Sequence, residues 1–171
     1  MDYNGVSPHI KVNVRISAID KASGKEEIIG EGHNTLCEAG IGVLAKAAAG
    51  KDEYISHMGA LFNTGGATSF TKTSTYTDFI SAGGTLKQMP ILLHDFRDYN
   101  ATSANVHKDN VLEMQSVFVE PNTGGGDTLR STALLYVSPN GVQTMVAVYN
   151  CNINKPANQH LSVTWSILYT V

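Results

Sequence analysis

The clearest pattern in this chain is the alternation of apolar and polar residues over its last eleven positions. Apolar side chains occupy every second position from Leu161 to Val171, and serine or threonine fills most positions between them. Successive side chains of a β-strand point to opposite faces, so the pattern predicts a strand with one buried face. Trp165, the only tryptophan, lies on that face and is expected in the core of a scaffold.

Similar patterns recur along the chain and predict a mainly β protein. Residues 10–19 alternate between apolar and polar, which predicts a strand with one solvent-exposed face. Ser138-Pro139-Asn140-Gly141 is a strong hairpin signal, because proline fixes φ and Asn-Gly tolerates the left-handed region. Pro90 indicates a sheet edge or a bulge. The expected strands are 10–19, 26–31, 54–62, 86–98, 111–119, 129–137, 141–150 and 161–171.

One segment predicts an α-helix near residues 35–49. Asn34 or Thr35 is suited to cap its N-terminus, and Glu38 follows Thr35 at the spacing of a capping box. Small apolar residues form a narrow stripe along it, and Gly50 is suited to end it. We expect Gly40 and Gly42 where this helix lies close against a sheet.

These elements predict a single antiparallel β-sandwich, of jelly-roll or immunoglobulin-like topology, with one short helix. Residues 9–171 form the expected domain. Residues 1–8 contain turn formers and no periodicity, so they are expected to form an arm. Residues 63–84, rich in threonine, serine and glycine, are expected to form a long surface loop.

Composition narrows the classes of function. The net charge is −3, which does not suggest binding to nucleic acid. No apolar run is long enough to span a bilayer, and the N-terminus lacks the features of a signal peptide, so neither a membrane nor secretion is expected. Charged residues make up only 16% of the chain. A weakly charged polar surface is typical of proteins that pack side by side in assemblies, because buried charge is costly to desolvate; alternatively, threonine-rich β-proteins simply carry fewer charges.

Motifs for catalysis or cofactor binding are not found. The chain has no P-loop, dinucleotide fingerprint, HExxH, CxxC or GxSxG. The six histidines are scattered without ligand spacing. Cys37 and Cys151 allow one disulfide, but two separate buried thiols are expected. We therefore expect no cofactor, no metal and no enzymatic activity.

Three weaker constellations each lack a required part. His94 with Asp95 and Asp98 lacks the glycine and glutamate of a calcium loop. Glu113 and Glu120 lie seven apart on an expected strand and face opposite sides, so they do not flank one glycosidic bond. Cys37 lies in the first helical turn, which favours a thiolate, but no oxyanion motif accompanies it.

Aromatic residues in or near the loops offer a candidate sugar-binding platform. Tyr76 and Tyr99 are the candidates for contact with a glycan. A core or interface role for such aromatic residues is the stronger expectation.

The order of elements resembles small virion structural proteins of tailed bacteriophages. The similarity is carried by residues 33–50, HNTLCEAGIGVLAKAAAG, which resemble a recurrent asparagine and glycine segment followed by a short alanine- and leucine-rich helix. The strand at 55–62, the strand at 111–119, the hairpin at 129–150 and the closing Val163-Thr164-Trp165-Ser166-Ile167 are also similar to this family. Residues 63–84 depart from the pattern.

The resemblance implies a non-enzymatic virion protein. We expect a capsid decoration, or cement, protein that stabilises the phage head through contacts with the major capsid protein or other virion proteins, and that forms a homo-oligomer. A tail, baseplate or fibre component and a carbohydrate- or receptor-binding module are the alternatives, with a hydrolase as a further rival. The arm and the edge strands are expected to contact neighbouring subunits. The candidate contact residues in the arm are Asp2, Tyr3, Asn4, Val6 and Pro8.

Overall fold

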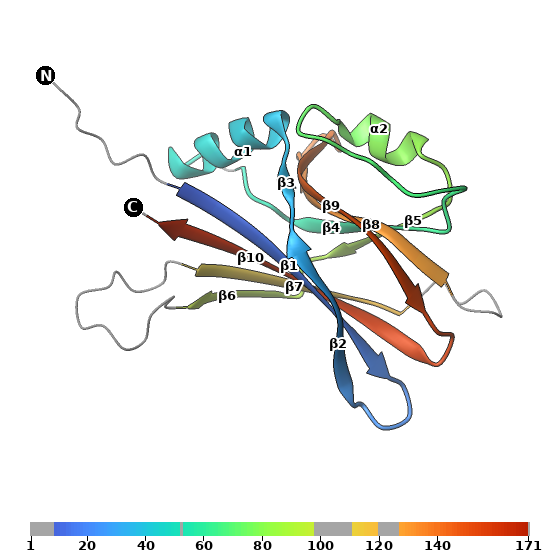
Figure 1. Ribbon diagram of the computed structural model, residues 1–171. Coiled ribbons are helices and arrows are strands. Elements are labelled where there is room, and N and C mark those ends of the chain that lie inside the picture. Colours follow the sequence, from blue (N-terminus) through green and yellow to red (C-terminus); the bar gives the residue numbers. More distant parts are fainter. Residues whose placement is uncertain (1–8, 52, 98–110, 120–126, 171) are drawn as a thin grey trace, which may run out of the picture.

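A computed structural model describes residues 9–51, 53–97, 111–119 and 127–170. Two antiparallel sheets face each other within this part of the chain, and Figure 1 shows them as the two layers of a β-sandwich. The predicted fold class is thereby confirmed. Residues 1–8, the expected arm, lie outside the described residues.

Sheet A joins the first and last described strands of the chain. β1 pairs with β10 along its whole length, from His9 opposite Thr170 to Asp20 opposite Gln159. The strand order is β2-β1-β10-β7-β6, so β10 is the central strand. The strands of sheet A are β1 (His9–Asp20), β2 (Glu26–His33), β6 (Leu93–Arg97), β7 (Val111–Phe118) and β10 (Gln159–Thr170).

Sheet B contains the predicted hairpin. Its strand order is β3-β9-β8-β4-β5. Gly141 has a φ of 82° in the β8–β9 turn, and the backbone N–H of Ser138 donates to the carbonyl of Val142 at 2.8 Å. Pro90 ends β5, which is an edge strand, as its sequence indicates. The strands of sheet B are β3 (Thr35–Leu36), β4 (His57–Phe62), β5 (Thr85–Pro90), β8 (Asp127–Val137) and β9 (Gln143–Lys155).

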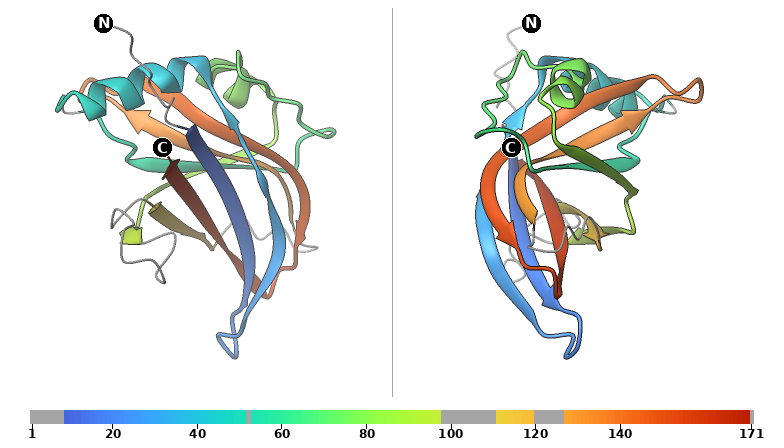
Figure 2. Two further views of the ribbon diagram at one scale, coloured as in Figure 1. Left: turned by 60° about the vertical axis from the view of Figure 1, so that its left-hand side comes forward. Right: turned by 90° about the vertical axis from the view of Figure 1, so that its right-hand side faces the viewer.

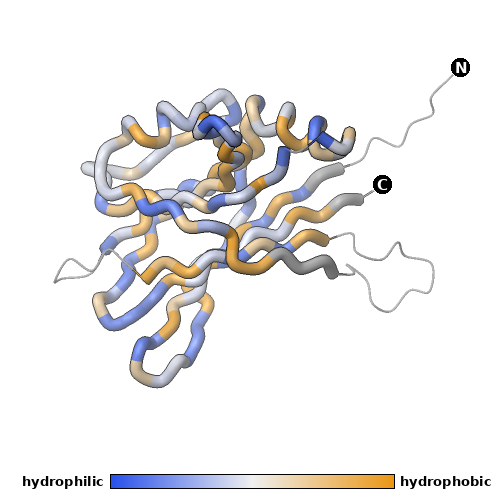
Figure 3. The backbone as a smooth tube through the Cα atoms, turned by 180° about the vertical axis from the view of Figure 1, so that it is seen from behind, coloured by the Kyte–Doolittle hydropathy of each residue, from blue (hydrophilic) through white to orange (hydrophobic). Residues whose placement is uncertain are grey.

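The main core fills the space between the two sheets. Trp165 is fully buried in it together with Ile16 and Phe62, which confirms the expected role of the tryptophan. Figure 3 shows the alternation that produces this arrangement, with apolar and polar positions following one another along the strands. One face of β1, of β7 and of β10 thus supplies the core, and the other face points away from it.

The first helix, α1 (Glu38–Ala48), is where the sequence predicts it, but its N-terminal cap is different. Cys37 is the N-cap residue and contributes no side-chain hydrogen bond. The expected cap at Asn34 or Thr35 is wrong because Thr35 and Leu36 pair with the edge of β9 as the short strand β3. Gly40 does lie close against a sheet, since a Cβ there would be 2.2 Å from the Val146 carbonyl oxygen; Gly42 faces open space.

A second helix, α2 (Tyr76–Ser81), lies within the segment expected to be a surface loop. Thr75 and Asp78 cap it reciprocally in a capping box, a signal that the surrounding threonine and serine residues obscure. Phe79 is fully buried against the outer side of sheet B. Residues 64–75, before this helix, also cross sheet B: the Asn150 side chain accepts from the Phe70 N–H and donates to the Phe70 carbonyl.

Candidate functional site: the outer face of sheet A

The two outer faces of the sandwich differ in what covers them. α2 and residues 64–75 lie over sheet B, as Figure 2 shows most clearly in its right-hand view. No helix or strand of the described residues lies on the opposite side, over sheet A. We call this surface the outer face of sheet A: the side of β2, β1, β10, β7 and β6 that points away from the core.

Strand pairing arranges the outer face in rows that run across the strands. In one row, Asn13 of β1 stands between His33 of β2 and Ser166 of β10, and Ser166 in turn pairs with Glu113 of β7. In the next row, the residues in strand order are Glu31, Arg15, Thr164, Gln115 and Leu93. The residues of each row come from distant parts of the sequence, so only the strand order brings them together.

Small hydroxyl side chains occupy the central strand of this face. Ser162 is 1% exposed and Thr164 is 7% exposed, although the alternation predicts that they face away from the core. The explanation at Ser162 is a long neighbour: the Gln115 side-chain amide donates to the Ser162 hydroxyl at 2.7 Å. Ser17, the β1 neighbour of Ser162, is buried as well, and so is Leu168 farther along the same side of β10. Much of this side of the central strand is therefore shielded from solvent.

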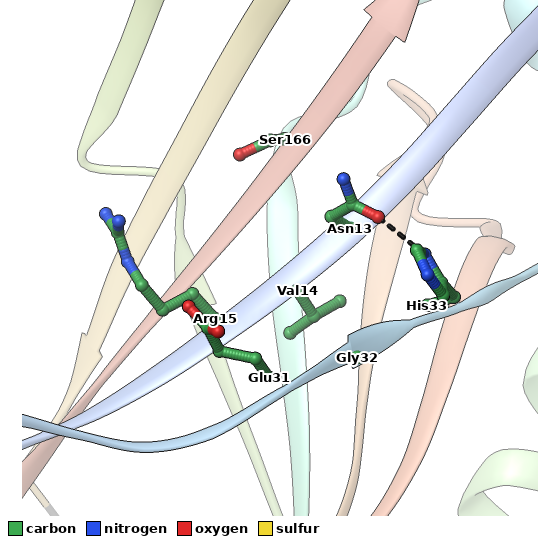
Figure 4. A pocket seen from close by; sticks show the side chains of 7 residues that line it. All are labelled: Asn13, Val14, Arg15, Glu31, Gly32, His33 and Ser166. Carbon is green, nitrogen blue, oxygen red and sulfur yellow. Dashed lines mark hydrogen bonds between the residues drawn. The ribbon is translucent and has the colours of Figure 1, made fainter.

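A depression of about 370 Å³ lies where β2, β1 and β10 meet on this face. Figure 4 shows its polar lining, with His33 Nδ1 hydrogen-bonded to Asn13 Oδ1 at 2.7 Å. An amide oxygen only accepts, so His33 Nδ1 donates in this bond. Arg15 and Glu31 are directly paired across the strands and are exposed. The depression therefore presents donors and acceptors but no aromatic platform.

One edge strand of each sheet contains features that oppose the addition of another strand. β2 has three acidic residues, Glu26, Glu27 and Glu31, and β5 has Lys87 and the terminal Pro90. Edge charges and proline discourage pairing between edges. Among the described residues, a sheet face is thus a better candidate for protein contacts than these two edges.

Of the two candidates for glycan contact, the structure describes only Tyr76. Tyr76 is half-buried against the cluster that contains Cys37 and Phe79, and its hydroxyl accepts a hydrogen bond from the Gln88 amide at 2.7 Å. A ring that is packed in this way offers a sugar only part of its face. Tyr99 and the arm candidates Asp2, Tyr3, Asn4, Val6 and Pro8 lie outside the described residues.

The two cysteines are free thiols. Cys37 is fully buried, and burial raises its pKa to about 11. Burial likewise raises the pKa of Cys151, which is half-buried, to about 12. A nucleophilic cysteine needs the opposite shift, so the geometry at Cys37 does not favour a thiolate.

The other candidate residues for catalysis or metal binding lie apart from one another. His33 bonds to Asn13 on the outer face, whereas His57 bonds to the Ser56 hydroxyl within sheet B. Glu113 lies on the outer face, and Glu120 lies outside the described residues. Within the described ranges, no three histidine, cysteine or acidic side chains are placed to hold a metal ion. No helix in the same ranges has the length and apolar character needed to cross a membrane.

Comparison with known proteins gives no match to any protein-family model, curated protein or solved structure. The fold class therefore depends on the sequence pattern and the sheets themselves. Sequence reasoning also missed the outer face as a unit: alternation marks which residues point away from the core, but not which strands are neighbours.

Proposed function

We propose that this chain is a non-enzymatic structural protein of a tailed-bacteriophage virion, and that it acts as a capsid decoration protein. The observation that carries the proposal is the asymmetry of the sandwich. Sheet B is covered on its outer side, whereas sheet A presents a broad, polar outer face over which no described element lies. A surface of this kind suits contact with other proteins in an assembly.

The composition of the outer face supports the same function. Its central strand has Ser162, Thr164 and Ser166, and charged side chains such as Arg15 and Glu113 stand to either side of them. Of the three hydroxyl residues, Ser166 is the one that is partly exposed, and with the exposed Asn13 and Arg15 beside it, it is available for polar contacts with another protein. Contacts of this kind are individually weak, and repetition over a symmetric particle gives firm attachment through multivalency.

The chemistry of the described residues gives a hydrolase less support. The thiol of Cys37 is buried with a raised pKa, and in the depression His33 Nδ1 bonds to Asn13 rather than to Glu31. Receptor binding is a weaker alternative, since no tyrosine, tryptophan or phenylalanine lines the depression around Arg15 and Asn13.

The test is location on the particle. Phage particles are purified on a density gradient and separated into heads and tails, and the chain is quantified in each fraction with an antibody raised against the recombinant protein. We expect it in the head fraction at a fixed ratio to the major capsid protein. Its presence in tails alone supports the tail or fibre alternative, and its absence from particles contradicts the proposal.

A second measurement addresses the stabilising role. Heads that lack this protein are heated in parallel with complete heads, and release of DNA is followed with an intercalating dye. Release at a lower temperature, restored when the purified protein is added back, is the expected result. Identical release from both kinds of head would show that the protein is not a cement.

A further inference from the structure

We propose that residues 65–84, which we call the strap, open and close over the outer side of sheet B as a unit while both sheets stay folded. Opening uncovers the apolar cluster that contains Phe79 and Cys37. The strap lies on the opposite side of the sandwich from the outer face of sheet A, so this opening is independent of the proposed function. Its support comes from the topology, the hydrogen bonds and the packing of the strap.

The strap leaves sheet B and returns to it at neighbouring positions. β4 ends at Phe62 and β5 begins at Thr85, and these two residues are paired directly across the strands. Figure 1 shows the strap and its helix α2 above these strands. A surface segment whose ends lie close together can lift away without separating the elements it joins. Opening therefore breaks no pairing between β4 and β5.

Glycine pairs lie at both ends of the strap. A Cβ at Gly65 or Gly66 would meet no atom within 4 Å beyond the adjacent residues, so little packing holds this end in place. At the other end, Gly83 and Gly84 have φ values of 78° and 81°, a region that glycine enters without strain. Hinges are terminal residues of a moving segment that absorb changes in φ and ψ. Both ends of the strap are suited to this role.

Many hydrogen bonds of the strap join residues within the strap itself. The Ser74 hydroxyl accepts from the Thr71 N–H at 2.9 Å. The capping box of Thr75 and Asp78 closes the first turn of α2. These bonds are local in sequence, so they do not depend on contact with the sheet. The strap can therefore leave the sheet with much of its backbone still hydrogen-bonded, which lowers the cost of opening.

A small set of hydrogen bonds ties the strap to the rest of the described chain. The strongest tie is at Asn150 of β9, whose side chain accepts from the Phe70 N–H at 3.1 Å and donates to the Phe70 carbonyl at 2.9 Å. Further hydrogen bonds join Thr68 to Arg130, Lys72 to Glu38 and Tyr76 to Gln88. Removing the Asn150 side chain should therefore release the middle of the strap and leave the pairing within the sheets intact.

Two aromatic rings supply apolar contact beneath the strap. Phe79 is fully buried, and its ring centroid lies 5.3 Å from that of the half-buried Phe70. A depression of about 240 Å³ beside them is lined by residues 64, 66–70 and 82, so packing around Phe70 is incomplete. The main core, by contrast, fills the space between the two sheets. Segments with fewer buried apolar contacts open at a lower free energy than the whole domain unfolds.

Cys37 and Trp165 distinguish opening of the strap from unfolding of the chain. Cys37 is fully buried in the cluster with Phe79, and the next residue, Glu38, donates its backbone N–H to the Lys72 carbonyl of the strap at 2.8 Å. Trp165 lies in the main core between the sheets. Opening of the strap should therefore expose the Cys37 thiol and leave the tryptophan emission unchanged.

The experiment measures how fast a maleimide labels Cys37 in the folded full chain, over a series of urea concentrations below the unfolding transition. Mass spectrometry of peptides separates Cys37 from Cys151. We expect the labelling rate to rise with urea much less steeply than the equilibrium constant of global unfolding, because the slope follows the surface that is exposed. The tryptophan emission should stay native throughout. A slope equal to that of global unfolding would overturn the inference.

Three variants then identify the segment that opens. Asn150→Ala removes both hydrogen bonds to Phe70 and should speed labelling about tenfold. Asn154→Ala, on the same strand, instead removes a hydrogen bond to Thr128, and it serves as the matched control with labelling unchanged. Ile16→Val weakens the main core, so it should lower the free energy of global unfolding and leave labelling unchanged.

Two results with these variants contradict the inference. Faster labelling in Ile16→Val, in proportion to its loss of global stability, would show that only unfolding exposes Cys37. Labelling that is unaffected by Asn150→Ala would show that the strap does not control access to the thiol. The urea series uses the native chain alone, so it decides the question even where Asn150→Ala does not fold. None of these outcomes bears on the location of the protein in phage particles, which tests the proposed function separately.

Discussion

The side chains of Asn63 and Asp127 are joined by a hydrogen bond of 2.6 Å at the end of sheet B, where β4 ends and β8 begins. Asn63 has a φ of 55°. Its side-chain oxygen also accepts from the backbone N–H of Thr128 at 2.8 Å, and Asp127 is only 3% exposed. One asparagine therefore accommodates a left-handed backbone and donates to a buried carboxylate.

Replacing Asn63 with alanine should lower the free energy of unfolding by about 3 kcal/mol, because it removes a hydrogen bond to a charged group and the polar side chain through which asparagine tolerates the left-handed region. Asn63→Gly removes the same hydrogen bonds, but glycine adopts the left-handed conformation without strain. Its loss in the free energy of unfolding should therefore be about 1 kcal/mol smaller than that of the alanine variant. Urea unfolding followed by tryptophan fluorescence measures both. Equal losses in the two variants would show that the backbone conformation contributes nothing.

Two glycines in α1 should respond oppositely to alanine. A Cβ on Gly40 would lie 2.2 Å from the Val146 carbonyl oxygen, so the helix must move away from β9. Gly40→Ala should lower stability by about 1–3 kcal/mol. A Cβ on Gly42 would meet no atom within 4 Å beyond its chain neighbours and the backbone of its own helix, so Gly42→Ala should raise stability by about 0.5–1 kcal/mol through helix propensity.

Thermal unfolding monitored by circular dichroism distinguishes these two effects. The two variants add the same methyl group to the same helix, so any difference in sign comes from the contact with β9. A stabilising Gly40→Ala would show that the helix is free to shift at little cost.

Much of the fold could be predicted from the sequence because alternation directly reports which side of a strand is buried. The strand with Trp165, the β8–β9 hairpin and the position of α1 followed from such local signals. The cap of α1 did not, because Thr35 has the right spacing for a capping box but is held by β9 as part of β3. A tertiary contact there overrides a local preference.

The candidate site was less accessible to prediction for a related reason. Asn13, Ser166 and Glu113 form one row only because β10 pairs with both β1 and β7. Sequence periodicity specifies the direction of each side chain, but the neighbours of a strand depend on the whole topology. The candidate surface is therefore a property of strand order, and no short motif encodes it.

The capping box of α2 should contribute measurably to the stability of the protein, although the helix is short. The Thr75 hydroxyl accepts from the Asp78 N–H at 3.3 Å, and the Asp78 carboxylate accepts from the Thr75 N–H at 2.7 Å. Thr75→Ala should lower the free energy of unfolding by about 1 kcal/mol. Thr75→Ser keeps the hydroxyl group and should lose much less. Chemical denaturation checks the comparison; a serine variant as weak as the alanine variant would show that the hydroxyl is not the stabilising group.

The buried thiols should make stability fall at alkaline pH. Burial raises the pKa of Cys37 from 9.0 to about 11, so above pH 9 the unfolded chain releases a proton that the native chain retains. Stability linked to this thiol is complete below pH 9 and is lost as pH rises toward 11. At about pH 10 the loss amounts to about 1.4 kcal/mol for this residue.

Comparison of Cys37→Ala with the native chain isolates this effect. The variant loses packing at every pH, so its absolute stability is lower, but its free energy of unfolding should decline less steeply between about pH 8 and about pH 10. Other titrating groups, such as Tyr149, whose pKa is also raised by burial, contribute equally to both chains and cancel in the difference between slopes. Parallel slopes would mean that the Cys37 thiol ionises as readily in the native protein as in the unfolded chain.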